Sequence, residues 1–363
     1  MSMSRLHSSL ALAAGVALIA ASPSTFGAPA QRTFVKSNGV DSNPCTLAAP
    51  CRSFAAAMTN TLATGEVIVL DSAGYGPVSI AQSVSIIAPP GVYAGVSVSS
   101  GAGITVSGAS ITVVLQGLSI NGTGGANGIL FTSGSELYVV NCSISNMTST
   151  GIFATAGGGR LIVSDTTVRD NTLFGVLVSG TVNAVFDRVR AEGNGSVGIY
   201  GAGGASMSVR ESVASNNAGG GVWAQASTGA TTKLTVDGTV ISDNNASGTA
   251  ANANDPGSLA ILDVIRSTMA RNNSGYGASA SAVTSAFAVM TVAQSLMSEN
   301  AFGGMAGGGA LAATTAFASG NTFTRNSSAG ILQSGTATVH TRSNNAGEQV
   351  PPTSGTVTAV PGF

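Results

Sequence analysis

Four acidic residues recur at related points of a repeating sequence and could together hold a divalent cation. They are Asp165, Asp187, Glu211 and Asp237. If successive repeats stack as neighbouring strands, these carboxylates would lie ~5 to 10 Å apart. Ca²⁺ takes six or more oxygen ligands, usually from more than one carboxylate. Arg188 and Arg210 fall in the same segments, so we favour alternating charges along a solvated face, which explain the group without a metal.

A second candidate site is a column of large apolar residues. The first residue after each of five repeated glycines is aliphatic and should point into the core: Ile129, Ile152, Val176, Ile199 and Val222. Side chains alternate along a strand, so the next residue should point outward. These outward residues are Leu130, Phe153, Leu177, Tyr200 and Trp223. They predict an apolar stripe ~19 Å long, which ends where the column falls to Ala250, Ser279 and Ala306.

An exposed apolar stripe favours contact with sugar rings or with a partner protein. The alternative is that a loop, the C-terminal tail or self-association covers it, and this alternative stays open at the level of sequence. Trp223 is the only tryptophan in a chain with 5% aromatic residues, so the stripe stands out from its background.

The three cysteines predict one disulfide and one inert thiol. Cys45 and Cys51 lie in the short segment CTLAAPC, which can close on itself in an oxidising compartment. Two cysteines without a nearby histidine provide too few ligands for zinc, so we expect no metal site there. Cys142 lies in the apolar stretch LYVVNCSI and should be a buried thiol. His340 has no carboxylate near it in the sequence, which favours a surface or corner histidine over a catalytic base.

The element that must position these residues is a repeat of roughly 25 residues. An Asn followed four residues later by Gly recurs, at Asn171/Gly175, Asn194/Gly198, Asn217/Gly221, Asn244/Gly248, Asn273/Gly277, Asn300/Gly304 and Asn326/Gly330, with a looser copy at Asn146/Gly151. Short runs such as GVLV and LIVSDTTV alternate in the way that indicates strands. Each repeat can bury its apolar side only against its neighbours. We therefore predict an all-β fold, a right-handed parallel β-helix solenoid of about eleven coils.

The recurring residues have structural explanations within such a coil. Small Gly residues suit a narrow interior and tight corners. Asn tolerates a left-handed backbone, and its amide can bond to the next Asn one coil along.

The two ends of the chain differ from the repeats. Residues 1–30 are expected to be a signal peptide, because a short apolar run follows Arg5 and small residues precede the expected cleavage after Ala30. Residues 31–65 are expected to form an N-terminal cap. Its short helix, from Arg52 to Leu62, would turn Phe54, Met58 and Leu62 toward one face. The β-helix would occupy residues 66–345, and residues 346–363 would form a tail along the last coils.

Composition excludes several classes of function. The chain has 14 Lys+Arg and 15 Asp+Glu, a net charge of −1, and 8% charged residues. There is no excess of positive charge to meet phosphates, which excludes a basic nucleic-acid binder. No stretch after the first 30 residues is apolar for 18 residues, so we expect no membrane span in the mature chain.

The segment RTFVKSNGVDSNPCTLAAPCRSFAAAM, the following GYGPVSI and the repeats that restart with Gly-Ile resemble secreted bacterial right-handed parallel β-helix repeat proteins of the pectin-lyase-like superfamily. That superfamily mixes lyases, hydrolases, epimerases and adhesins. Its polygalacturonase-like members imply paired Asp residues and a Gly-His-Gly element, whereas here no two acids are adjacent. Its pectate-lyase-like members imply Ca²⁺ held by several acids, for which the four acids above are the candidates.

The function predicted from these observations is a binding or structural one. We expect a protein exported to the periplasm or the outside, with glycan or cell-surface contact through the outer column and no cofactor. The alternative is a polysaccharide lyase or hydrolase with a degenerate acidic site, and Ca²⁺ belongs only to that alternative.

Overall fold

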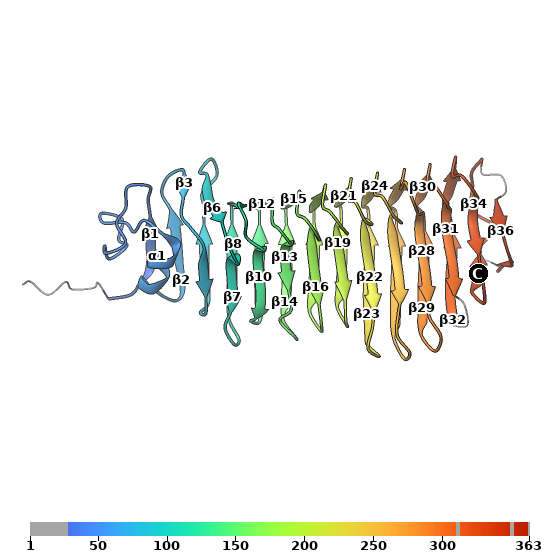
Figure 1. Ribbon diagram of the computed structural model, residues 1–363, viewed down its shortest axis with the longest axis horizontal. Helices are drawn as coiled ribbons and strands as arrows, with labels where there is room; N and C mark the ends of the chain where they lie inside the picture. The colour runs from blue at the N-terminus through green and yellow to red at the C-terminus, as the bar shows by residue number, and fades with distance from the viewer. Residues whose placement is uncertain (1–27, 310–312, 349–351, 362–363) are drawn as a thin grey trace, which may run out of the picture.

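The computed structural model describes residues 28–309, 313–348 and 352–361. Its strands form three parallel sheets that run the length of a rod, with the N-terminal cap at one end and the C-terminus at the other (Figure 1). Each coil passes through sheet A, then sheet B, then sheet C, and pairs in register with the next coil. Within the described residues no helix is long and apolar enough to cross a membrane.

The strands of the three sheets alternate along the chain. Sheet A contains β1 (Ala30–Val35), β2 (Thr61–Val69), β5 (Val84–Ile87), β8 (Thr112–Gln116), β11 (Glu136–Val140), β14 (Arg160–Ser164), β17 (Asn183–Asp187), β20 (Ser206–Arg210), β23 (Thr231–Asp237), β26 (Leu259–Ile265), β29 (Phe287–Ala293), β32 (Ala313–Ser319), β35 (Thr338–Thr341) and β37 (Val357–Ala359). Sheet B contains β3 (Ala73–Gly74), β6 (Ala94–Val98), β9 (Leu118–Gly122), β12 (Ser143–Ser145), β15 (Thr167–Arg169), β18 (Arg190–Glu192), β21 (Val213–Ser215), β24 (Val240–Ser242), β27 (Thr268–Ala270), β30 (Leu296–Ser298) and β33 (Thr322–Thr324). Sheet C contains β4 (Val78–Ile80), β7 (Ala102–Ser107), β10 (Asn127–Ser133), β13 (Thr150–Ala154), β16 (Val176–Ser179), β19 (Ile199–Ala202), β22 (Val222–Ala226), β25 (Thr249–Ala253), β28 (Tyr276–Ala282), β31 (Gly303–Gly309), β34 (Ala329–Gln333) and β36 (Thr353–Ser354).

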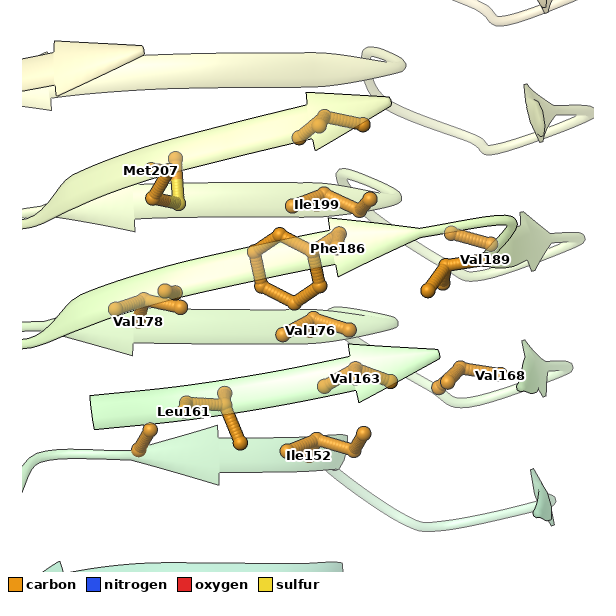
Figure 2. Packing of buried hydrophobic residues seen from close by; sticks show 14 of the residues in the cluster. Ile152, Leu161, Val163, Val168, Val176, Val178, Phe186, Val189, Ile199 and Met207 are labelled. Carbon is orange, nitrogen blue, oxygen red and sulfur yellow. The ribbon is translucent and has the colours of Figure 1, made fainter. Parts of the chain in front are cut away.

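The core is a narrow stack of aliphatic side chains between the sheets. Leu161 and Val163 of β14 face Ile152 of β13, and the same arrangement repeats one coil along with Val176 and Phe186 (Figure 2). The predicted inward column is fully buried, at Ile129, Ile152, Val176, Ile199 and Val222. Because strands alternate their side chains, this inward column fixes the outward one.

A ladder of buried asparagines joins successive coils at the turn between sheets B and C. Each side-chain amide donates to the next asparagine's Oδ1 at 2.8 to 3.1 Å, through Asn171, Asn194, Asn217, Asn244, Asn272, Asn300 and Asn326. The predicted bond from coil to coil is confirmed, but two predicted members are wrong. Asn272, not Asn273, holds the ladder position, because that turn has one extra residue. Met147, not Asn146, holds the earlier position, where its backbone N–H donates to Asn171.

The left-handed backbone lies one residue before the ladder rather than on it. The residues at those positions have φ between 50° and 64°: Asp170, Gly193, Asn216, Asp243, Arg271, Glu299 and Arg325. The ladder asparagines are thus retained for their side-chain bonds, since their own backbone does not require a residue that tolerates positive φ.

The repeated glycines are required by a close approach between coils. A Cβ on any glycine from Gly128 to Gly304 in this column would lie 2.5 to 2.9 Å from the carbonyl oxygen of the next glycine in the column. At Gly175 it would also lie 2.8 Å from the Asn194 amide. The Asn/Gly pair is therefore one packing unit, in which the missing side chain makes room for the amide ladder.

Helix α1 (Phe54–Asn60) is shorter than predicted and turns a different face inward. The Ser53 hydroxyl accepts from the Ala56 N–H and caps it. Phe54, Ala57 and Asn60 are buried, whereas Leu62 is 41% exposed. The predicted Phe54, Met58, Leu62 face is wrong because the helix ends at Asn60 and the chain continues as β2 from Thr61.

Both ends of the solenoid are closed by their own strands. At the N-terminal end, β1 pairs with β2, so sheet A begins before the helix. At the C-terminal end, β36 pairs with β34 and β37 pairs with β35. Residues 1–27, which include the apolar run of the predicted signal peptide, lie outside the described residues.

The cysteines are arranged as predicted. A disulfide joins Cys45 to Cys51, and Cys142 is a buried free thiol. Burial raises the pKa of the Cys142 thiol to about 11, which keeps it protonated and unreactive at neutral pH.

Thiol titration checks this arrangement. Folded, non-reduced protein should show no reactive thiol at pH 7, and denatured, non-reduced protein should show one thiol per chain, because only Cys142 becomes accessible. Cys142→Ser should remove that one thiol. Three thiols in denatured, non-reduced protein purified from an oxidising compartment would contradict the disulfide.

Candidate functional site

The outer face of sheet C carries the predicted apolar column in strict register. Leu130 pairs with Phe153, Phe153 with Leu177, Leu177 with Tyr200, and Tyr200 with Trp223. All five side chains are half-buried. Downstream the same register passes through Ala250, Ser279 and Ala306, and upstream Leu130 pairs with Thr105. The structure therefore brings together all five predicted residues, and we call them the outer column.

The aromatic members of the outer column lean toward the turn between sheets B and C. The Tyr200 ring stacks on Phe174, with centroids 5.0 Å apart and planes 6° apart. The Trp223 Nε1–H donates to the Ser247 carbonyl oxygen at 2.9 Å. Its ring occupies the space next to Gly220, where a Cβ would meet the ring at 2.1 Å. These contacts hold the two rings in place, and both side chains remain partly exposed.

The turn itself contributes aromatic residues that the sequence analysis missed. Phe174 supports Tyr200, and further along the rod Tyr276 contacts Phe302 edge to face at 5.7 Å. Phe302 is 52% exposed. A signal for Phe174 was present in the sequence, because it directly precedes a repeated glycine and so must lie beside the first residues of sheet C. The apolar surface is therefore wider than the single column.

The described part of the C-terminal tail does not cover the outer column. It extends sheets C and A beyond the last coil, at β36 and β37, whereas the column lies on β10 to β22. Cover by that part of the tail, one of the alternatives left open by the sequence, is therefore wrong. Half-burial of the column arises from neighbouring residues of the same sheet and turn.

The four predicted acids lie at the corner between sheets A and B, in two adjacent columns rather than one. In the first, Asp187 pairs with Arg210 and Arg210 pairs with Asp237. In the second, Asp165 and Glu211 have left-handed backbones. Arg188 lies between them in the same column and also has a left-handed backbone. The backbone N–H groups of this column donate to carbonyl oxygens of the first column in the next coil, from 165 to 187, from 188 to 210 and from 211 to 237. Acidic and basic residues thus alternate along both columns.

Arginine side chains form ion pairs with three of these acids. Arg188 binds both oxygens of Asp165, at 2.7 and 3.0 Å, and also reaches Asp187 at 2.6 Å. Arg266 pairs with Asp237. The hydrogen bonds from Arg188 hold the pKa of Asp165 below its usual value. Asp165, Asp187 and Asp237 are therefore ion-pair partners on a solvated face, where such pairs contribute little stability.

A depression of about 460 Å³ lies beside these ion pairs. Its lining consists of Asp187, Arg210, Glu211, Asp237, Gly238 and Arg266. Across the part of the chain that the structure describes, no cluster of three or more His, Cys, Asp or Glu side chains is arranged to hold a metal ion. His340 does not line this depression. It lies on β35 of sheet A, where its ring stacks on Phe317 with centroids 5.0 Å apart.

A family model described as "Right handed beta helix region" matches residues 92–234 and 127–289, which together span more than half of the chain. The chain belongs to the right-handed β-helix family. The predicted fold class, a right-handed parallel β-helix of about eleven coils with one short helix, is thereby confirmed. The family's description names a fold and no activity.

Several solved structures are similar to this chain at low sequence identity. A crystal structure of pectate lyase Pel9A is 14% identical over 88% of this chain and 80% of its own, with a TM-score of 0.40. The A-module of the Azotobacter vinelandii mannuronan C-5 epimerase AlgE4 is 14% identical over 82% and 89%, with a TM-score of 0.47. A rhamnogalacturonan lyase is 14% identical over 79% and 74%, with a TM-score of 0.35. No curated protein sequence matches this right-handed β-helix chain.

Proposed function

We propose that this right-handed β-helix protein is an exported, non-catalytic binding protein whose outer column contacts glycans. The observation that carries the proposal is the in-register column of five large apolar side chains on the outer face of sheet C. Aromatic rings held in fixed orientation lose little entropy when a ligand binds. The repeat of the coils, ~4.8 Å per strand, gives a ligand with repeating units a series of equivalent contacts.

Export is part of the same proposal. The expected signal peptide at residues 1–30 supports it, and so does the Cys45–Cys51 disulfide, because structural disulfides persist in oxidising compartments. A glycan-binding surface is also useful where polysaccharides of the cell envelope or its surroundings are found.

Tyr200→Ala should weaken glycan binding about tenfold or more, because a central aromatic contact of an interface carries a large share of its binding energy. The matched control is Tyr138→Ala, which removes a half-buried tyrosine from the outer face of sheet A. Binding would be measured on a glycan array and then by calorimetry with the glycans that bind. We expect both variants to lose ~1 kcal/mol of stability, and only Tyr200→Ala to lose affinity.

Two results would contradict the proposed function. Equal losses of affinity in the two variants would show that sheet C is not the binding face. A wild-type dimer that Tyr200→Ala converts to a monomer, with no glycan bound by either, would assign the column to self-association.

The alternative function is a polysaccharide lyase or hydrolase that uses Asp165, Asp187, Glu211 and Asp237, with Ca²⁺. The depression lined by Glu211 and Asp237 is the observation in its favour, whereas the arginine ion pairs weigh against it. Ca²⁺-dependent cleavage of an acidic polysaccharide that is lost in Glu211→Gln would support the enzyme in place of the binding protein.

A further inference from the structure

Sheet C differs from sheets A and B in its charge. In the part of the chain that the structure describes, none of the twelve strands of sheet C contains Asp, Glu, Lys, Arg or His. Charged residues occur instead in strands of sheet A, such as Arg160 and Asp187, and in strands of sheet B, such as Arg190 and Glu192. The outer column therefore lies on the one face of the rod whose strands carry no formal charge.

The outward positions beside the outer column, and their continuation in the next two coils, are uncharged, and apart from Ala202 they carry hydroxyl or amide groups. These positions lie two residues after each column residue. Their strand pairing runs from Ser179 through Ala202 to Gln225, and then to Asn252 and Ser281. Gln225 and Asn252 are partly exposed, and the Ser281 hydroxyl donates to Asn252 at 2.9 Å. Hydroxyl and amide groups both donate and accept, as sugar hydroxyls do.

The turns beyond these positions continue the same chemistry. The segments that leave the five column strands toward sheet A are 134–135, 155–159, 180–182, 203–205 and 227–230, and they consist of Gly, Ser, Thr, Ala and Val. Across the column, on the other side, Asp170 and Asp243 stand at the start of the turns, where each is paired with an arginine. The neighbourhood of the outer column thus offers apolar faces and neutral polar groups, and the carboxylate of Asp255, on the next turn toward sheet A, accepts from the Thr228 N–H at 2.8 Å.

We infer that the ligand of the outer column is an uncharged polysaccharide and not a polyuronate or sulfated chain. This inference rests on the proposed glycan-binding function and specifies its substrate class. Recognition of carboxylate or sulfate groups uses arginine or lysine, which form short charge-assisted hydrogen bonds. A polyanion on sheet C would lose water from its charged groups without gaining such a partner, which costs free energy. A neutral polysaccharide has no charged groups to desolvate, and its rings and hydroxyls can stack and form neutral hydrogen bonds on sheet C.

The test compares polysaccharides that share a backbone and differ in charge. Polygalacturonate and its fully methyl-esterified form are one such pair, and the panel adds neutral glucans and mannans with alginate as a second polyanion. The wild-type protein should bind at least one neutral polymer, with an affinity that does not change between 50 mM and 500 mM NaCl. It should bind polygalacturonate and alginate at least tenfold more weakly than that polymer.

A gain of charge provides a second measurement. Gln225→Arg introduces a cation beside the outer column and should raise affinity for polygalacturonate about tenfold. The matched control is Thr235→Arg, which adds the same charge at an exposed outward position of sheet A and should raise it much less.

The outcomes separate the inference from the proposed function. Salt-sensitive binding of polyanions in preference to neutral polymers, lost in Tyr200→Ala, would overturn the uncharged ligand while leaving the glycan-binding column intact. Binding of no glycan, or binding that Tyr200→Ala leaves unchanged, would overturn the proposed function itself. A partner protein that competes for the column in place of any glycan would do the same.

Discussion

Asn244→Ala is expected to lower the free energy of unfolding by about 4 kcal/mol. Asn244 is fully buried, and its Oδ1 accepts from the backbone N–H and the side-chain amide of Asn217, at 3.1 and 2.9 Å. Its own amide donates to the Ala214 carbonyl and to Asn272, at 3.0 and 3.1 Å. Alanine would leave these partners without a bond, and each buried unsatisfied group costs ~1 to 3 kcal/mol.

The adjacent residue provides the control. Asn245 is exposed, and its backbone N–H donates a hydrogen bond to the Asn217 carbonyl oxygen of the neighbouring coil at 3.0 Å. Asn245→Ala keeps that bond and should change stability by less than ~0.5 kcal/mol. Urea unfolding followed by circular dichroism measures both. Equal midpoints for the two variants would mean that the ladder contributes no more to stability than an exposed side chain.

The ladder also shows how far sequence reasoning reaches. The Asn/Gly spacing predicts parallel coils because only a stack of repeats uses the same residues at the same interval. The same spacing selects Asn273, four residues before Gly277, where the structure uses Asn272. Both are asparagines in the same turn, and the choice depends on which amide faces Asn244 and Asn300 in the neighbouring coils.

The candidate site, too, could be predicted from the sequence only in part. The direction of the outer column was predictable, because the alternation of a strand ties Tyr200 to the buried Ile199. Its half-burial was not, since Phe174, which covers Tyr200, comes from the turn of the preceding coil, and Ser247, which binds Trp223, comes from the turn of the next coil. The acids at the other corner were expected to stack at related points. Their division into two columns depends on the left-handed residue at each corner. That residue can be Asp, Arg, Glu or Gly, so no single residue type marks its position in the sequence.

Gly198→Ala is the second substitution expected to have a large effect, a loss of about 2 to 3 kcal/mol. The added methyl would lie 2.8 Å from the Asn217 amide nitrogen and 2.9 Å from the Gly221 carbonyl oxygen. Neither atom is free to move, because the Gly221 carbonyl accepts from the Ile199 N–H at 3.0 Å and the amide belongs to the ladder. Insertion of one methyl group into such a well-packed site typically costs ~1 to 3 kcal/mol.

Gly157→Ala separates this packing cost from the general effect of replacing glycine. Gly157 is exposed, and its added methyl would meet only the Thr181 hydroxyl at 3.5 Å. Because alanine restricts the unfolded chain, this variant should be unchanged or up to ~1 kcal/mol more stable. The two glycine variants should therefore shift the urea midpoint in opposite directions or by clearly unequal amounts. If Gly198→Ala proved as stable as Gly157→Ala, the glycine column would have to be explained by something other than the close approach of successive coils.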